Sequence, residues 1–252
     1  MLITELQYPE LFRISMLVIL SFTMFFALTQ REIPDTPILF GFIASIAMIY
    51  FLGMAPASDE IGLDRLTYED MFLHSDIYLR DGFRDILFIL YAKICYSLCG
   101  NTTGCFIISA TIYVAAYLYF YKKACPKKYL YLFIIGSLAI GFTSYHYNVL
   151  RAGLAIACVL IAISKNQNKY ISILFSCLAI GIHATTGLIV FGYIIANKFN
   201  NTKYYYLLWV TMLLLLFLGA FNSLSHILTP LTTVADNRFE GYLSGGVSEY
   251  QV

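Results

Sequence analysis

Apolar residues in this chain fall in long uninterrupted runs, which short polar segments separate. A helix that crosses a bilayer needs about 20 consecutive, mostly apolar residues, and several of the runs approach that length. The runs lie at 12–28, 37–55, 83–99, 105–121, 129–148, 152–164, 170–196 and 204–224. This pattern predicts an all-α, polytopic membrane protein with about seven or eight transmembrane or partly spanning helices. We expect a single integral membrane domain over residues 1–252.

The composition supports this interpretation. Hydrophobic residues make up 60% of the chain and charged residues only 12%, whereas soluble domains carry roughly a quarter charged residues. A soluble enzyme is therefore excluded. Run 12–28 has no basic segment before it and no small-residue cleavage site, so it predicts a retained first helix and not a signal peptide. The six cysteines form no CxxC pair and are expected to be small buried hydrophobes.

Charged residues are distributed unevenly along the chain. Eight of the 15 acidic residues lie between Asp59 and Asp85, whereas residues 86–235 contain ten basic residues and no Asp or Glu. Nearly all of these basic residues lie in short loops, which the positive-inside rule places in the cytoplasm. Counting crossings from these loops places the acidic loop, residues 56–82, on the outside.

Two apolar runs separate the acidic loop from the first lysine-bearing loop, so one of the two cannot span. Run 83–99 is the better candidate, because it carries Arg84, Asp85 and Lys93. We expect it to lie in the membrane interface or to dip partway into the bilayer. An ordinary spanning helix with polar ends is the alternative.

The second half of the chain contains apolar segments that are too short to cross the bilayer or that polar residues interrupt. Residues 150–164 give about 22 Å of helix, against a hydrocarbon core of about 30 Å. Run 170–196 is either one long crossing or two short arms, and polar and flexible residues interrupt it at 183–187. Residues 145–148 form a similar interruption. Because non-helical backbone at membrane depth must be covered by protein or line a water-filled cavity, we predict a recessed, outward-open cavity at Arg151 and His183.

Arg151 and His183 are the main candidates for chemistry. Arg151 lies between two apolar runs and has no acidic residue near it in the sequence. Its guanidinium suits a phosphate or pyrophosphate, although an interfacial arginine that snorkels to headgroups is the simpler alternative. His183 could act as a general base or donate a hydrogen bond, and a packing histidine is the alternative. His74 and His146 are weaker candidates, and the four histidines have no spacing typical of a metal site.

Other functional classes find little support. The acidic loop could bind a divalent cation or sugar hydroxyls, but for most of its members a solvated loop is the preferred interpretation. Nucleotide-binding and hydrolase motifs are missing from the sequence. The chain also lacks the basic aromatic patch expected for nucleic-acid binding.

Four short elements follow one another along the sequence. They are Gly62-Leu63-Asp64-Arg65-Leu66-Thr67-Tyr68 followed by Phe72, Asp81-Gly82-Phe83, Asn148-Val149-Leu150-Arg151-Ala152-Gly153-Leu154-Ala155, and Ile182-His183-Ala184-Thr185-Thr186-Gly187-Leu188-Ile189. In order and spacing they are similar to the elements G-x-D-x-x-x-Y, D/E-P-G-F, I-R-Q-x-x-A and F-H-x-S-A-L-I. The chain thereby resembles the family that carries these elements, the EpsG-like and Wzy-type bacterial polysaccharide polymerases. The sequence departs from the usual residues of these elements at Ala152, Gly82 and residues 185–187. These departures affect the expected substrate contacts more than the expected fold.

The resemblance implies a GT-C-like membrane glycosyltransferase with one large outside loop and broken helices. Such an enzyme joins undecaprenyl-diphosphate-linked oligosaccharide repeat units into O-antigen or a related polymer, at the periplasmic face of the bacterial inner membrane. Arg151 and His183 would be catalytic, Asp64 and Tyr68 would contact sugar or hold Arg151, and two weaker candidates for the second phosphate are Arg84 and Arg238. No metal and no cofactor are expected.

The expected partners are the lipid-linked oligosaccharide, membrane lipid and a chain-length regulator protein, and no nucleic acid. The alternatives are a flippase or transporter for the same lipid-linked sugars, a membrane acyltransferase that modifies surface sugars, and a structural membrane subunit. Against the acyltransferase, the sequence shows no acidic residue near His183. Members of the family tend to be longer, so the chain could be C-terminally truncated.

Overall fold

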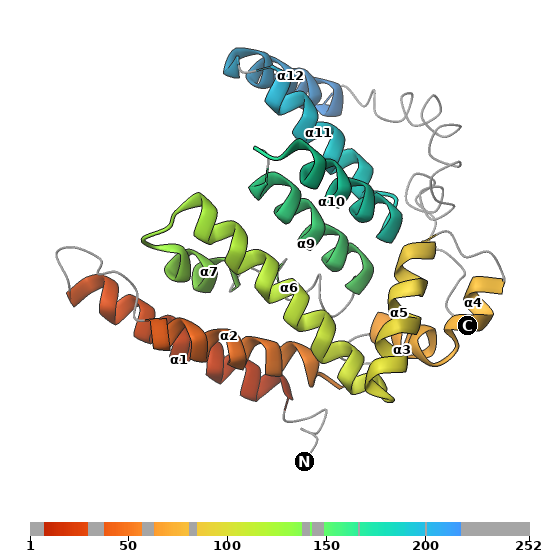
Figure 1. Ribbon diagram of the computed structural model, residues 1–252. Helices are drawn as coiled ribbons and strands as arrows, with labels where there is room; N and C mark the ends of the chain where they lie inside the picture. Colours follow the sequence, from red (N-terminus) through yellow and green to blue (C-terminus); the bar gives the residue numbers. More distant parts are fainter. Residues whose placement is uncertain are drawn as a thin grey trace. The chain divides into compact units, whose positions relative to one another are not determined.

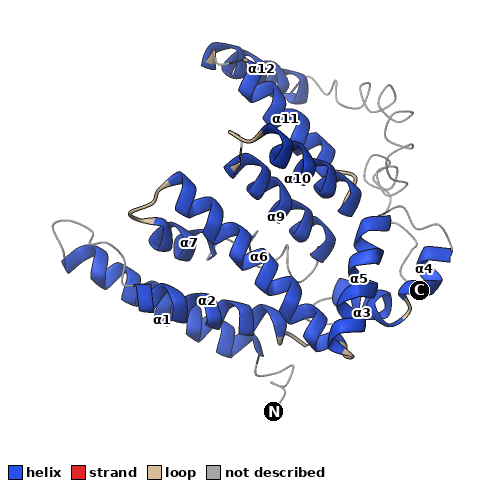
Figure 2. Ribbon diagram, in the orientation of Figure 1, coloured by secondary structure: helices blue, strands red, loops and turns tan. Residues whose placement is uncertain are grey.

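The computed structural model describes residues 8–29, 38–56, 63–80, 85–137, 142, 149–165, 167–199 and 201–217. Within these ranges all regular secondary structure is helical and there is no strand, which confirms the all-α class (Figure 2). The helices, labelled in Figure 1, are α1 (Tyr8–Thr29), α2 (Ile38–Gly53), α3 (Leu63–Leu73), α4 (Ser75–Arg80), α5 (Ile86–Cys99), α6 (Thr102–Ala124), α7 (Tyr129–Ser137), α9 (Leu150–Ser164), α10 (Lys169–Ile182), α11 (Thr186–Lys198) and α12 (Thr202–Phe217).

Most of the apolar runs become helices close to their expected bounds. The clearest case is run 170–196, which forms two short arms, α10 and α11, with a break at residues 183–185. Helix α9 begins at Leu150 and ends at Ser164, so it has the short length that the sequence indicated. The other expected break, at residues 145–148, lies outside the described residues.

Helix α6 has both the length and the apolar composition to cross a membrane by itself. Shorter apolar helices include Ile86–Cys99, Leu150–Ser164, Lys169–Ile182 and Thr186–Lys198. At 14 residues, α5 is about 21 Å long, and its interfacial or partly inserted position stays a prediction. The number of spanning helices remains a prediction.

The chain divides into two compact units, residues 1–190 and 191–252. In the first unit α6 is the central helix, and it packs against α2, α5, α7 and α9, while α9 and α10 form the most extensive helix pair (Figure 1). A tight hairpin joins α5 to α6. Gly100 takes the left-handed conformation, with φ 67°, at the end of α5, and the Asn101 side chain accepts a hydrogen bond from the Gly104 N–H at 2.7 Å.

Two apolar clusters make up most of the core of this unit. One joins α2, α6 and α7, where Tyr113 and Tyr117 on α6 contact the Phe142 ring. The other joins α3, α5, α6 and α9, where Phe88 contacts Tyr68 and Phe72 contacts Phe106 in edge-to-face pairs. The second cluster supports the residues that the sequence marked as candidates for chemistry, because Tyr68 belongs to it and Leu150 precedes Arg151.

The acidic stretch is not an irregular loop within the described residues. It forms two short helices, α3 and α4, on which Asp64, Asp70 and Asp76 are exposed. Arg65 anchors α3 to the bundle. Its guanidinium is buried, donates to the Leu52 and Gly53 carbonyl oxygens at 3.0 and 2.6 Å, and lies 3.8 Å above the Phe106 ring. A cation there satisfies carbonyl groups at the C-terminal end of α2.

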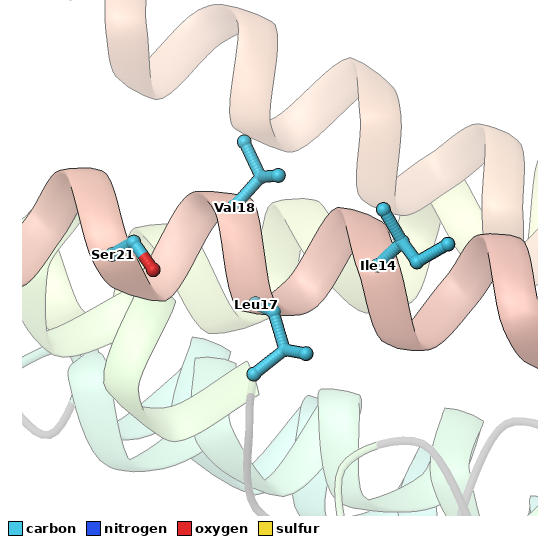
Figure 3. A pocket seen from close by; sticks show the side chains of 4 residues that line it. All are labelled: Ile14, Leu17, Val18 and Ser21. Carbon is cyan, nitrogen blue, oxygen red and sulfur yellow. The ribbon is translucent and has the colours of Figure 1, made fainter.

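Many large apolar side chains remain exposed, as expected for a surface that faces lipid. On α1, a shallow hollow is lined by Ile14, Leu17, Val18 and Ser21 (Figure 3). Its lining is almost entirely apolar and contains none of the candidate residues for chemistry. The predicted polar cavity at Arg151 and His183 therefore remains a prediction.

Candidate functional site

Arg151 occupies the first turn of α9. The N-cap residue of this helix, Val149, has a side chain that cannot cap it. The positive end of the helix dipole makes this an unfavourable place for a cation. A nearby anion is therefore needed to offset both the dipole and the partial burial of the guanidinium.

His183 ends α10. Its backbone is extended, with φ −152° and ψ 108°, and its N–H still donates to the Ala179 carbonyl oxygen. The carbonyl oxygen of His183 accepts two hydrogen bonds from Thr186, from the hydroxyl at 2.7 Å and from the backbone N–H at 3.0 Å. The break between α10 and α11 is thus held in one conformation, with its exposed backbone groups satisfied.

Asp85 brings these two residues together. Its Oδ2 atom accepts a 2.6 Å hydrogen bond from Arg151 Nη1 and lies 3.5 Å from His183 Nδ1. The second distance is at the long end of the hydrogen-bonding range. All three side chains are largely buried, with exposed fractions of 9% for Asp85, 12% for Arg151 and 18% for His183. The three residues come from the ends of three different helices, α5, α9 and α10.

A close approach of α5 and α10 makes this arrangement possible. Gly181 lies directly against the Leu87 side chain, and an added Cβ would collide with Leu87 Cδ1. Asp85 is two residues before Leu87, and His183 is two residues after Gly181. A larger residue at position 181 would have to displace the Leu87 side chain or widen the spacing of α5 and α10, at the ends of which Asp85 and His183 lie.

The surroundings of Asp85 keep it ionised. Burial would raise the pKa of its carboxyl group. The hydrogen bond from His183, the charges of Arg151 and His183, and the Ala184 backbone N–H act in the opposite direction and outweigh burial. The pKa of Asp85 therefore lies below its ordinary value, and the carboxylate is negative near neutral pH.

Tyr68, on α3, is a further neighbour of Arg151. It is buried in the second apolar cluster and its hydroxyl is hydrogen-bonded to Arg151. Burial raises the pKa of Tyr68, and the charge and hydrogen bond of Arg151 only partly oppose this. Tyr68 is thus a neutral phenol that holds the guanidinium. Asp64, one turn earlier on α3, is exposed.

The candidate residues from the sequence are therefore only partly gathered in one place. Tyr68, Arg151 and His183 meet in one site, and Asp64 lies on the exposed face of the neighbouring helix α3. Arg84 and Arg238 lie outside the described residues, as does His146. His74 lies on the surface, where Nδ1 is 2.7 Å from Asp70 Oδ1.

The residue that sequence reasoning missed is Asp85. The expectation that His183 lacks an acidic neighbour is wrong in three dimensions, since Asp85 is 98 positions away in the chain but close in space. The objection to an acyltransferase that rested on this expectation no longer holds. One signal was available: Asp85 is the last acidic residue before the long stretch without acids, and it lies within the apolar run 83–99.

The arrangement offers a cation with several donors, a carboxylate, an imidazole and a phenol. Such a set can bind an anion and accept a proton. Among the described residues, no group of three or more His, Cys, Asp or Glu side chains is placed to hold a metal ion. The chemistry that the guanidinium, carboxylate, imidazole and phenol can supply is electrostatic and acid–base.

Comparisons with known proteins identify the family. The sequence model of one family, described as the EpsG family, matches residues 38–252, which include Tyr68, Asp85, Arg151 and His183. Neither the curated proteins nor the solved structures gave a match to the chain. Since the family match covers most of the sequence, this chain belongs to the EpsG family, a family of membrane proteins of polysaccharide biosynthesis.

Proposed function

We propose that this chain is a membrane glycosyltransferase that joins undecaprenyl-diphosphate-linked oligosaccharide repeat units into O-antigen or a related surface polymer. The observation that carries the proposal is the meeting of Arg151, Asp85 and His183 at three helix ends, in a chain of the EpsG family. A transfer from a lipid diphosphate needs an anion-binding group and a proton acceptor close to each other.

In the proposed reaction, a hydroxyl oxygen of the acceptor repeat unit attacks the anomeric carbon of the growing chain. The bond between that carbon and the diphosphate oxygen breaks, and undecaprenyl diphosphate leaves with the electron pair. The hydroxyl proton passes to a base. One glycosidic bond forms, one glycosyl phosphate bond breaks, and the polymer remains on the lipid of the acceptor.

Arg151 would neutralise the negative charge that develops on the leaving diphosphate. It comes from a helix N-terminus, where backbone N–H groups also favour an anion. Tyr68 keeps the guanidinium in place from the side of α3. A planar guanidinium can donate two parallel hydrogen bonds to phosphate oxygens, which a lysine ammonium cannot do.

His183 would accept the hydroxyl proton. Its Nδ1 atom faces the Asp85 carboxylate, so Nε2 is the nitrogen placed to take the proton. A carboxylate beside Nδ1 selects the tautomer and stabilises the positive charge that the ring acquires. Asp64, exposed on α3, is in a position to contact sugar hydroxyls.

The site would face the periplasm, in the inner membrane, with α3 and α4 on the outer side. This orientation rests on the lysine-bearing loops, and it places the start of α6 outside and its lysine-bearing end inside. The lipid-linked substrate would reach the site from the outer leaflet. A chain-length regulator protein is the expected partner.

Two other classes use similar residues. A buried Asp–Arg–His group also suits proton-coupled transport of the same lipid-linked sugars. The carboxylate beside His183 also suits an acyltransferase that activates a sugar hydroxyl. Neither class would lengthen the polymer, so product length separates them from the proposal.

The test is the surface-polysaccharide ladder of a strain that lacks its own polymerase. We expect the wild-type chain to restore a ladder, and Arg151→Lys and His183→Ala to give single repeat units while inserting normally. Lys93→Gln is the matched control, because it removes an exposed cation from α5, and its ladder should equal that of the wild type. A full ladder from Arg151→Lys would contradict the diphosphate role, and single units from the wild type would favour the transporter or the acyltransferase.

A further inference from the structure

The Asp85 side chain does not cap the helix that it precedes, although aspartate normally does so at this position. Asp85 is the N-cap residue of α5, and an N-cap aspartate usually accepts a hydrogen bond from an N–H of the first helical turn. Here the side chain makes no such bond. Its Oδ2 is turned to Arg151 and His183 instead, so α5 lacks the stabilisation that a capping side chain gives. The local sequence therefore does not account for this orientation.

Asp85 also binds the Arg151 guanidinium, which is the group that the diphosphate of the proposed substrate needs. With Arg151 Nη1 at 2.6 Å from Asp85 Oδ2, the two opposite charges cancel at short range. A diphosphate that approaches this pair meets a guanidinium already engaged by a carboxylate. Binding then requires the diphosphate oxygens to replace the carboxylate on Arg151, because two anions on one side of a guanidinium repel each other.

We propose that Asp85 is a positioning residue that holds Arg151 until the lipid diphosphate displaces it, and that the released carboxylate then acts on His183. This inference rests on the proposed function. The displaced carboxylate keeps its contacts with His183 Nδ1 and the Ala184 N–H. It then stabilises the ring as Nε2 takes the hydroxyl proton. Diphosphate binding and activation of the base are thereby linked through one side chain.

The proposal predicts opposite effects on binding and on turnover. Asp85→Asn keeps the size of the side chain and one acceptor oxygen but removes the negative charge. Without the competing charge, Arg151 should bind a diphosphate more tightly. Without the carboxylate beside Nδ1, His183 should be a poorer base. A residue with only a structural role would weaken both properties together.

The experiment uses the purified full chain in detergent micelles and farnesyl diphosphate as the probe, with farnesol as the uncharged reference. We expect Asp85→Asn to bind farnesyl diphosphate about tenfold more tightly than the wild type, a change of about 1.4 kcal/mol. The same variant should lose most of its ladder. Asp85→Glu keeps the charge and should bind the probe within about threefold of the wild type.

The matched control is Asp76→Asn, which removes the same charge from an exposed aspartate paired with Lys93. It should change neither binding nor the ladder. Unchanged or weaker binding of farnesyl diphosphate by Asp85→Asn would overturn the competition between Asp85 and the diphosphate. A separate result would overturn the proposed function: equal binding of farnesyl diphosphate by the wild type and Arg151→Gln would show that Arg151 does not bind the diphosphate.

Discussion

Two aspartate–cation pairs in this chain have the same length but opposite surroundings. Asp85 and Arg151 are 2.6 Å apart with exposed fractions of 9% and 12%, while Asp76 and Lys93 are 2.6 Å apart with exposed fractions of 71% and 49%. Judged by distance alone, the two pairs would be equally good candidates for a functional site. Water screens the exposed pair, whereas each charge of the buried pair depends on its partner. A short ion pair therefore marks a functional candidate only when burial makes its charges costly to separate.

The buried pair also has neighbours that the exposed pair lacks. Tyr68 and His183 contact its two members, and both come from other helices. Four elements thus converge on one carboxylate and one guanidinium. The exposed pair joins only α4 to α5. This convergence, more than the charges themselves, distinguishes a site from a surface contact.

The largest expected effect comes from removing one partner of the buried pair. Arg151→Leu leaves the buried Asp85 carboxylate without its arginine partner, so the free energy of unfolding should fall by about 3–5 kcal/mol. Thermal unfolding of the detergent-solubilised chain measures this. The double variant Asp85→Leu with Arg151→Leu should recover most of the loss, and Lys93→Leu should lower stability by at most about 1 kcal/mol. Equal losses for Arg151→Leu and Lys93→Leu would remove the distinction between the two pairs.

An intermediate effect should follow from separating α5 and α10. Gly181→Val places two methyl groups against Leu87, which should cost about 1–3 kcal/mol of stability and move Asp85 away from His183. The ladder should shorten or disappear. Gly192→Val on α11 is the control, since a Cβ there meets no atom within 4 Å. A normal ladder from Gly181→Val would show that the approach of the two helices does not matter for activity.

The smallest effect is expected in the exposed cluster of Asp70, His74 and Tyr78. The Tyr78 hydroxyl donates a 2.6 Å hydrogen bond to Asp70, which lowers the pKa of Asp70, and the same bond raises the pKa of Tyr78 to about 12. Because the folded chain prefers ionised Asp70, the resulting stabilisation is present above the ordinary aspartate pKa and is lost as the pH falls through the lowered value. For such an exposed group it amounts to about 0.2–1 kcal/mol.

Asp70→Asn should remove this part of the acid dependence. The difference in unfolding temperature between wild type and variant should therefore shrink as the pH falls below the ordinary aspartate range. A difference that grows on acidification would contradict the lowered pKa of Asp70. The polymer ladder should be the same for both proteins, because this cluster lies on the exposed face of α3 and α4.

The predictability of the fold differed between segments for physical reasons. Helices α9, α10 and α11 could be predicted within a few residues, because apolar length and the polar break at His183 are local properties. Helices α3 and α4 could not, since a stretch rich in charged residues has little apolar periodicity and is helical here partly because buried Arg65 attaches it to α2 and α6.

The candidate site could also be predicted only in part from the sequence. Arg151 and His183 were recognisable because charged and polar residues inside apolar runs are rare and expensive. Asp85 was not, because its distance to Arg151 depends on how α5 packs against α9 and α10. Tyr68 was expected to contact sugar or to hold Arg151, and its burial beside Arg151 agrees with the second role.

The sequence by itself determined the all-α membrane class, the short helices and the break at His183, and it singled out Arg151 and His183 as candidates for phosphate and proton chemistry. These follow from composition and local pattern, which act over a few turns of chain. Only the tertiary structure decided that one carboxylate serves both residues. Asp85 meets Arg151 and His183 across 66 and 98 positions, and such contacts arise from helix packing, here with Gly181 of α10 directly against the Leu87 side chain of α5.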